Sequence, residues 1–156
     1  MMVAQRRHAL HKNHSSSRPL SKNYEFIGLV GEAAMAHKYD LFLDLEDRPG
    51  GDERIDFYTN LGTLDVKTAL KPFNILREAK KDHADILILA GWHSEKRCVD
   101  FYGWEREKAI VDRCPVPKDF GYGIKNHFMH RSRLNRMEYF DRVFDIREFL
   151  NDRHTA

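Results

Sequence analysis

Cysteine is scarce in this sequence, and long hydrophobic runs are missing. Only two of the 156 residues are cysteines, and Cys98 and Cys114 form no C-x-x-C pair, so the chain offers neither a disulfide framework nor a cysteine zinc site. The longest apolar run is Ile86 to Ala90, whereas a membrane-spanning helix needs roughly 18 apolar residues or more. We therefore expect a protein without a membrane span, in a reducing compartment.

Several common catalytic motifs are also missing. The sequence contains no P-loop, no Rossmann glycine pattern, no G-x-S-x-G and no H-E-x-x-H. Asn126, His127 and His130 resemble part of an HNH nuclease site, but a second histidine at the required spacing is absent. Cys98 lies within an expected strand and has no evident partner histidine, which favours a buried structural thiol over a nucleophile.

Acidic residues are missing from the first 22 positions. Five basic residues in this segment give it a charge of +5: Arg6, Arg7, Lys12, Arg18 and Lys22. Since the whole chain carries +2, the remainder carries −3. Hydrophobic residues make up 42% of the chain, enough for one packed core. We predict a flexible basic arm over residues 1–22 and a single domain over 23–156.

The arm lacks the apolar segment of a secretory signal, but its composition overlaps with that of a mitochondrial transit peptide. An organelle address and a flexible segment that binds a polyanion therefore both remain open.

Hydrophobic periodicity predicts a mixed α/β domain with a central mixed sheet of about five strands flanked by helices. Gly28 and Gly31 fall inside the first expected helix, which suggests that another element packs closely against it. The expected helices cover residues 24–38, 72–81, 105–113 and 132–141, with a last turn over 145–150; the expected strands cover 41–45, 54–59, 63–68, 85–92, 98–104 and 126–130, with a loop over 118–125.

The segment RIDFYTNLGTLDVKT carries the most informative pattern. A hairpin turn centred between Asn60 and Leu61 places Asp56 opposite Asp65, and alternation places Lys67 on the same face as Asp65. The opposite face is then directed toward the core and carries Ile55, Phe57, Leu64, Val66 and Thr68.

Two neighbouring carboxylates repel each other unless a cation lies between them. Mg²⁺ prefers oxygen ligands and often takes one or two carboxylates plus phosphate oxygens. With a lysine nearby, such a group suits hydrolysis of a phosphodiester. The alternative is that these charges form ordinary cross-strand pairs on a solvated face, and the short D-x₈-D-x-K pattern alone favours that interpretation.

The surrounding sequence resembles the PD-(D/E)XK nuclease superfamily, the restriction-endonuclease-like fold that includes archaeal-type Holliday junction resolvases. In GLVGEAAMA, Glu32 matches the helix glutamate of that family; Asp56 matches its first aspartate, and Asp65-Val66-Lys67 matches its D/E-x-K signature. ADILILAGW, CVDFYGWERE and HFMHRSRLNRMEYF look like later core elements, so the resemblance covers roughly residues 24–141. Ile55 stands where the family often has proline, and Asp52 is a second candidate for the first aspartate.

The resemblance implies Mg²⁺- or Mn²⁺-dependent cleavage of nucleic acid, most often DNA, leaving 5′-phosphate ends. It implies that Asp56, Asp65 and the Val66 carbonyl bind the metal. Glu32 would assist directly or through water, and Lys67 would act on the nucleophile. The expected location is the cytoplasm of a bacterium or of a phage-infected cell.

DNA is the expected partner, with specificity supplied by a homodimer mate, by DNA structure or by another protein. The candidate DNA-binding residues are basic: Arg6, Arg7, Lys71, Lys125, Arg131, Arg133 and Arg136. Two alternatives remain open. One is a dimeric Holliday junction resolvase, and the other is a non-catalytic DNA-binding or scaffold protein.

Overall fold

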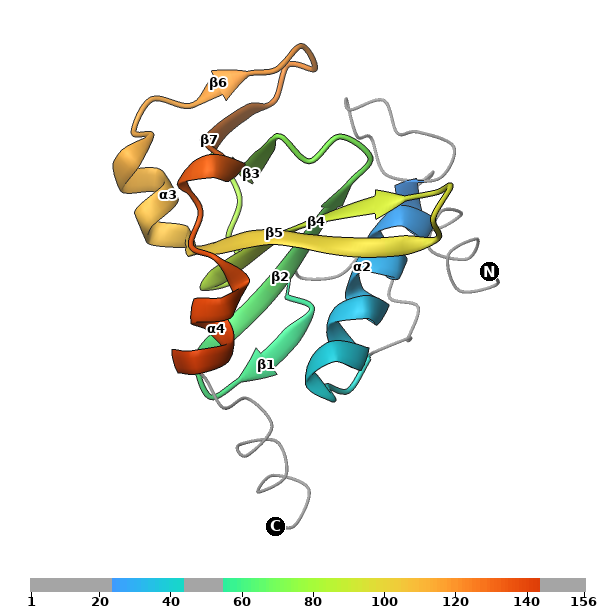
Figure 1. Ribbon diagram of the computed structural model, residues 1–156. Coiled ribbons are helices and arrows are strands. Elements are labelled where there is room, and N and C mark those ends of the chain that lie inside the picture. Colours follow the sequence, from blue (N-terminus) through green and yellow to red (C-terminus); the bar gives the residue numbers. More distant parts are fainter. Residues whose placement is uncertain (1–23, 44–54, 144–156) are drawn as a thin grey trace.

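The computed structural model describes residues 24–43 and 55–143. The predicted arm, Asp52 and the turn at 145–150 lie outside these residues. In chain order the elements are α2 (Tyr24–Tyr39), β1 (Phe57–Thr59), β2 (Gly62–Ala69), β3 (Asn74–Glu78), β4 (Ile86–His93), β5 (Cys98–Arg106), α3 (Glu107–Arg113), β6 (Lys118–Asp119), β7 (Lys125–His130), the 3₁₀ turn Arg131–Arg133 and α4 (Met137–Val143) (Figure 1).

The strands of the described residues form two sheets. The larger sheet has the order β1-β2-β4-β5, in which β2 and β4 run parallel and the other neighbours run antiparallel. The smaller sheet has the order β3-β7-β6 and is antiparallel throughout. The mixed α/β class and the central mixed sheet are therefore confirmed, but this sheet has four strands instead of about five, and the other three strands form a second sheet.

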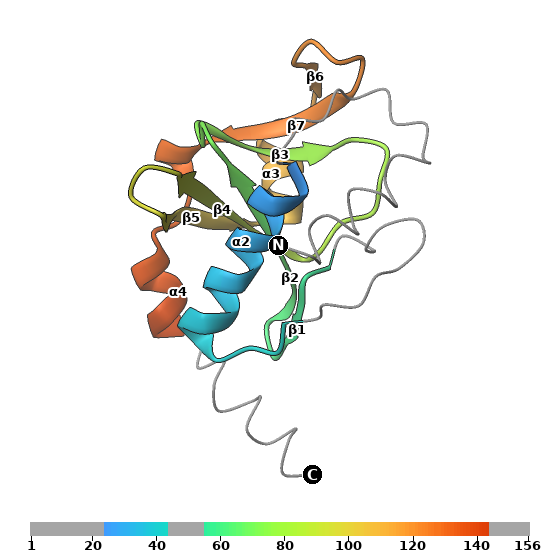
Figure 2. The ribbon, with the colours of Figure 1, turned by 90° about the vertical axis from the view of Figure 1, so that its right-hand side faces the viewer.

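The main reason for that difference is the segment 72–81, which was expected to be a helix. Residues Asn74–Glu78 instead form β3 and pair with β7, where Ile75 is fully buried opposite Met129. Pairing with a partner distant in the sequence thus overrides the local helical spacing. This second sheet lies across one end of the larger one (Figure 2), and side chains of β3 and β7 pack against the face of β4 that carries Leu87 and Leu89.

Both faces of the central strand β4 are covered, as its continuous apolar run predicts. On one face, Ile86 and Ile88 pack in a cluster with residues of α2 and α4, including Met35 and Phe140. On the other face, Leu87 and Leu89 pack with side chains of β3, β7 and α3.

Three smaller expectations are also wrong. Residues 41–43 form no strand, and the short strand β6 falls within the expected loop 118–125. The helix expected over 132–141 is divided because Asn135 exchanges two backbone hydrogen bonds with Trp104, each of 3.0 Å. Cys98, expected to be buried, is half-buried.

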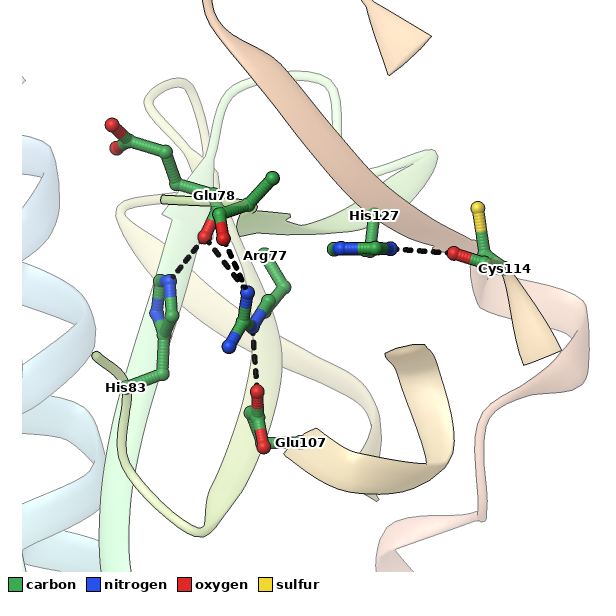
Figure 3. A network of polar contacts seen from close by, with 7 residues as sticks. Arg77, Glu78, His83, Glu107, Cys114 and His127 are labelled. Atoms are coloured by element: carbon green, nitrogen blue, oxygen red, sulfur yellow. Dashed lines mark hydrogen bonds and ion pairs between the residues drawn. The ribbon is translucent and has the colours of Figure 1, made fainter. Parts of the chain in front are cut away.

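Polar contacts fix the second sheet to α3 (Figure 3). Arg77 Nε donates to Glu107 Oε1 at 2.6 Å, and Arg77 Nη1 donates to the carbonyls of Glu78 and Ala79, each at 3.1 Å. His127 is buried, and its Nδ1 lies 2.5 Å from the Cys114 carbonyl oxygen. This histidine therefore holds β7 against the end of α3.

The hairpin register is the one expected over β1, but the expected pairing of Asp56 with Asp65 is not part of the ladder of paired residues, which ends at Phe57 and Leu64. Ile55, expected on the same face as Phe57, packs instead against the cluster of Leu87 and Leu89. Phe57 pairs with Leu64, Tyr58 with Thr63, and Thr59 with Gly62. Phe57, Leu64 and Val66 are buried in the cluster that includes α2.

Helix α2 approaches β2 closely at one of its two glycines. A Cβ atom on Gly31 would overlap the side chain of Thr68, whereas a Cβ on Gly28 would meet nothing within 4 Å. The expected close packing is therefore confirmed for Gly31 and wrong for Gly28. Because Glu32 follows Gly31, this approach also fixes the position of Glu32 relative to β2.

We predict that Gly31→Ala and Gly28→Ala have opposite effects on stability. Gly31→Ala should lower the free energy of unfolding by about 1–3 kcal/mol, because the added methyl group pushes α2 away from Thr68. Gly28→Ala should raise it by up to about 1 kcal/mol, because alanine favours a helix more than glycine does. Urea unfolding followed by circular dichroism measures both values; equal values for the two variants would contradict the packing described.

Candidate active site

The candidate site lies at the edge of β2, just beyond the end of its pairing with β1. Strand β1 begins at Phe57, and Asp56 continues the ladder by one bond from its N–H to the Leu64 carbonyl (2.8 Å). The next donor on this edge, the Val66 N–H, binds Asp56 Oδ2 at 2.7 Å instead of a backbone carbonyl. The Asp56 carboxylate thus accepts the hydrogen bond that a backbone carbonyl would accept if β1 extended further.

The Val66 carbonyl points to the same edge. In a strand, the N–H and C=O groups of one residue point toward the same neighbouring strand, and those of the residue two positions along point in the same direction. Since the Leu64 carbonyl accepts a bond from Asp56, the Val66 carbonyl is directed toward the Asp56 side.

Asp65 and Lys67 lie next to each other on one face of β2. They pair in register with Leu87 and Leu89 of β4, so they share the face that carries those leucines. Lys67 Nζ lies 2.5 Å from Asp65 Oδ2, and the side chains are 29% and 7% exposed, respectively. Asp65 Oδ2 receives no well-directed hydrogen bond from the residues that the structure describes, so the lysine ammonium compensates its charge.

Three carboxylates affect one another at this edge. Burial raises the pKa of the Asp56 carboxyl well above its ordinary value of 3.8, and the negative charges of Asp65 and Glu32 raise it further. The Val66 N–H and the Lys67 ammonium oppose this rise in pKa. Glu32 of α2, Asp56 before β1 and Asp65 of β2 therefore interact electrostatically with one another through Asp56.

The oxygen donors of this group fit a hard divalent cation. A cation beside Asp56 and Asp65 would remove the repulsion that raises the Asp56 pKa. Within residues 24–43 and 55–143, no three His, Cys, Asp or Glu side chains are placed to enclose a metal ion by themselves. Mg²⁺ commonly binds through one or two carboxylates and completes its shell with water and phosphate oxygens, so the pair is chemically sufficient.

The structure places most of the predicted DNA-binding residues on the surface. Lys71, Lys125, Arg133 and Arg136 are exposed. Arg131 is half-buried instead, with its guanidinium 5.7 Å from the ring centroid of Phe73 and 5.1 Å from that of Tyr102. Arg6 and Arg7 lie outside the described residues.

Few features of the sequence indicated a role for Phe73 or Tyr102. Phe73 fell in the segment expected to be a helix, and Tyr102 fell in the expected strand 98–104. The available signal was the stretch from residue 69 to 77, which contains an aromatic residue and two basic residues but no acid.

Comparisons of the chain with protein-family models, with curated proteins and with solved structures found no match. In the part of the chain that the structure describes, no helix is long and apolar enough to cross a membrane.

Proposed function

We propose that this protein is a metal-dependent nuclease that hydrolyses DNA phosphodiester bonds. The observation that carries the proposal is the convergence of Asp56, Asp65, Lys67 and Glu32 at one open edge of β2. A purely structural set of charges would gain stability from pairing, whereas burial beside two other acids disfavours the ionised form of Asp56.

Asp56 and Asp65 would hold Mg²⁺ or Mn²⁺, and the Val66 carbonyl and Glu32 would bind it directly or through water. When bound, the ion supplies Lewis-acid polarisation of the phosphate and lowers the pKa of a coordinated water. The chain's own contribution is to fix these oxygens. The Val66 N–H orients Asp56, and the contact of Gly31 with Thr68 positions α2.

Lys67 would act on the attacking water. Its ammonium already lies beside Asp65, so it can orient the water and balance the negative charge that develops on the phosphate oxygens. In the proposed step, a water oxygen bonds to phosphorus and the bond from phosphorus to the 3′ oxygen breaks. One proton of the water reaches the leaving oxygen, which gives a 5′-phosphate and a 3′-hydroxyl.

The basic residues of the second sheet and of the turn that follows it support a polyanionic substrate. Residues 120–137 contain no acidic residue, and Lys125, Arg133 and Arg136 are exposed. Lysine and arginine in such a segment neutralise phosphates and make binding dependent on salt.

The test is to incubate the wild-type protein with plasmid, linear duplex, single-stranded and four-way-junction DNA in Mg²⁺, Mn²⁺ or EDTA. We expect cleavage that requires a divalent ion and that is lost in Lys67→Ala. Lys108→Ala is the matched control, because Lys108 is exposed on α3 and should leave the rate unchanged.

The outcome separates the proposal from its alternatives. Preferential cutting of the four-way junction would identify a junction resolvase. Salt-sensitive DNA binding without cleavage by the wild-type protein in any metal would contradict the nuclease proposal and favour a non-catalytic DNA-binding or scaffold protein.

A further inference from the structure

We propose that Phe73, Tyr102 and Arg131, the aromatic–arginine platform, bind unpaired nucleotides of the substrate. This inference rests on the proposed function, because it specifies which DNA the site takes: a single strand or the unpaired part of a branched molecule.

The platform holds an arginine between aromatic groups. The Arg131 guanidinium lies within 5.7 Å of both ring centroids, and the Arg131 N–H donates to the Phe73 carbonyl at 2.8 Å. Among residues 24–43 and 55–143, no carboxylate forms an ion pair with Arg131. The guanidinium is therefore positioned by cation–π contacts with both rings, with its charge available to a phosphate.

Phe73 leaves a large apolar surface in water. It is 53% exposed although it is anchored through its backbone to Arg131. The Tyr102 ring is fixed by its hydroxyl, which lies 3.2 Å from His93 Nε2, and this histidine contacts Asp100 at 2.8 Å. An exposed aromatic ring beside an arginine is the combination on which bases of single-stranded nucleic acid stack.

The platform lies on the same face of the larger sheet as Asp65 and Lys67. Tyr102 packs in the cluster of Leu87 and Leu89, which are the partners of Asp65 and Lys67 in β4. Tyr102 and the residue before Phe73, Pro72, both crowd the space that a Cβ on Gly91 would occupy.

The pairing of β2 with β4 gives the distance from Lys67 to the part of the sheet that the platform covers. Gly91 pairs with Ala69, two residues beyond Lys67 on β2. Two residues along a strand and one strand across place this position about 8 Å from Lys67. The platform is therefore close enough to hold a nucleotide near the scissile phosphate.

Charge complementarity supports a nucleic acid as the occupant. The segments that carry Phe73 and Arg131, residues 69–77 and 120–137, contain no aspartate or glutamate. Lys71 and Arg133 are exposed in these segments. Bases in an intact duplex are already stacked on each other, so an exposed ring favours unpaired bases.

The test measures binding of fluorescent 15-nucleotide oligo-dT and of a blunt duplex of equal length, by anisotropy in EDTA. We expect Phe73→Ala to weaken oligo-dT binding about ten-fold and to change duplex binding less than two-fold. Arg131→Lys keeps the charge but loses the planar stacking group, so it should weaken oligo-dT binding while the salt dependence stays the same. Tyr139→Ala, an equally exposed aromatic residue on α4, should bind like wild type.

Oligo-dT affinities of both platform variants within two-fold of wild type would overturn the inference, as would an equal loss of duplex binding. The readout does not depend on cleavage, so the two proposals can fail separately. If oligo-dT binding depends on Phe73 but the protein cuts no DNA, the platform proposal is supported and the nuclease proposal is contradicted. If the protein cuts DNA with a divalent metal but Phe73→Ala binds oligo-dT like wild type, the nuclease proposal is supported and the platform proposal is contradicted.

Discussion

Asp65→Asn is expected to lower the rate of DNA cleavage by about 1,000-fold, equivalent to about 4 kcal/mol in the activation barrier. Asparagine has nearly the same shape as aspartate, so β2 and its pairing with β4 should persist. What is lost is a negative oxygen donor beside Asp56 and the partner of the Lys67 ammonium, which lies 2.5 Å away in the wild type. The measurement is the single-turnover rate on the best substrate at saturating Mg²⁺.

Stability gives the control for this variant. Lys67 is 29% exposed, so its ammonium can turn to solvent when Asp65 is neutral, and the free energy of unfolding should change by about 1 kcal/mol or less. Asp112→Asn removes an exposed carboxylate of α3 and should leave the rate unchanged. A folded Asp65→Asn protein with wild-type cleavage would exclude Asp65 from the site.

Asp56→Asn is expected to remove cleavage and, in EDTA, to stabilise the fold. Burial and the charges of Asp65 and Glu32 disfavour the ionised Asp56, and asparagine relieves that cost while its side-chain oxygen can still accept the bond from Val66. The gain in unfolding free energy should be about 1–2 kcal/mol, the usual size when an active-site compromise is relieved. Denaturant unfolding in EDTA measures it.

The pH dependence of that gain follows from the direction of the pKa shift. The folded protein raises the pKa of Asp56 above its ordinary value of 3.8, so protonation stabilises the fold. This stabilisation is fully present below about pH 4, where the carboxyl is protonated even in the unfolded chain, and is lost as pH rises through the raised pKa. The advantage of Asp56→Asn should therefore grow with pH. A constant difference between pH 4 and pH 8 would contradict the shift.

Divalent ions should reduce the difference between the two proteins. Mg²⁺ bound beside Asp56 stabilises the native wild-type protein by mass action, by about 1.4 kcal/mol at ten-fold excess over its dissociation constant. Asp56→Asn should show a smaller rise in melting temperature with Mg²⁺. Equal rises in both proteins would place any Mg²⁺ site elsewhere.

The sequence predicted the register of the hairpin that carries the candidate site better than it predicted the surrounding fold. The register of the hairpin followed from alternation and one tight turn, because both strands are local and one face is apolar. β3 could not be predicted in this way, because it exists through pairing with β7, some 50 residues later. The same pairing brings Phe73 to Arg131, so the aromatic–arginine platform was also hidden from local patterns.

The three-residue length of β1 has a consequence for self-association. Beyond Leu64, β2 has no paired strand on that side among residues 24–43 and 55–143, and a bare strand edge is a template on which a second chain can add and start aggregation. Here the Asp56 carboxylate occupies the next backbone donor, at Val66. An incoming strand would have to displace this hydrogen bond and lie against a group of acids. The carboxylates that we propose as metal ligands should thus also protect the sheet from edge-to-edge polymerisation.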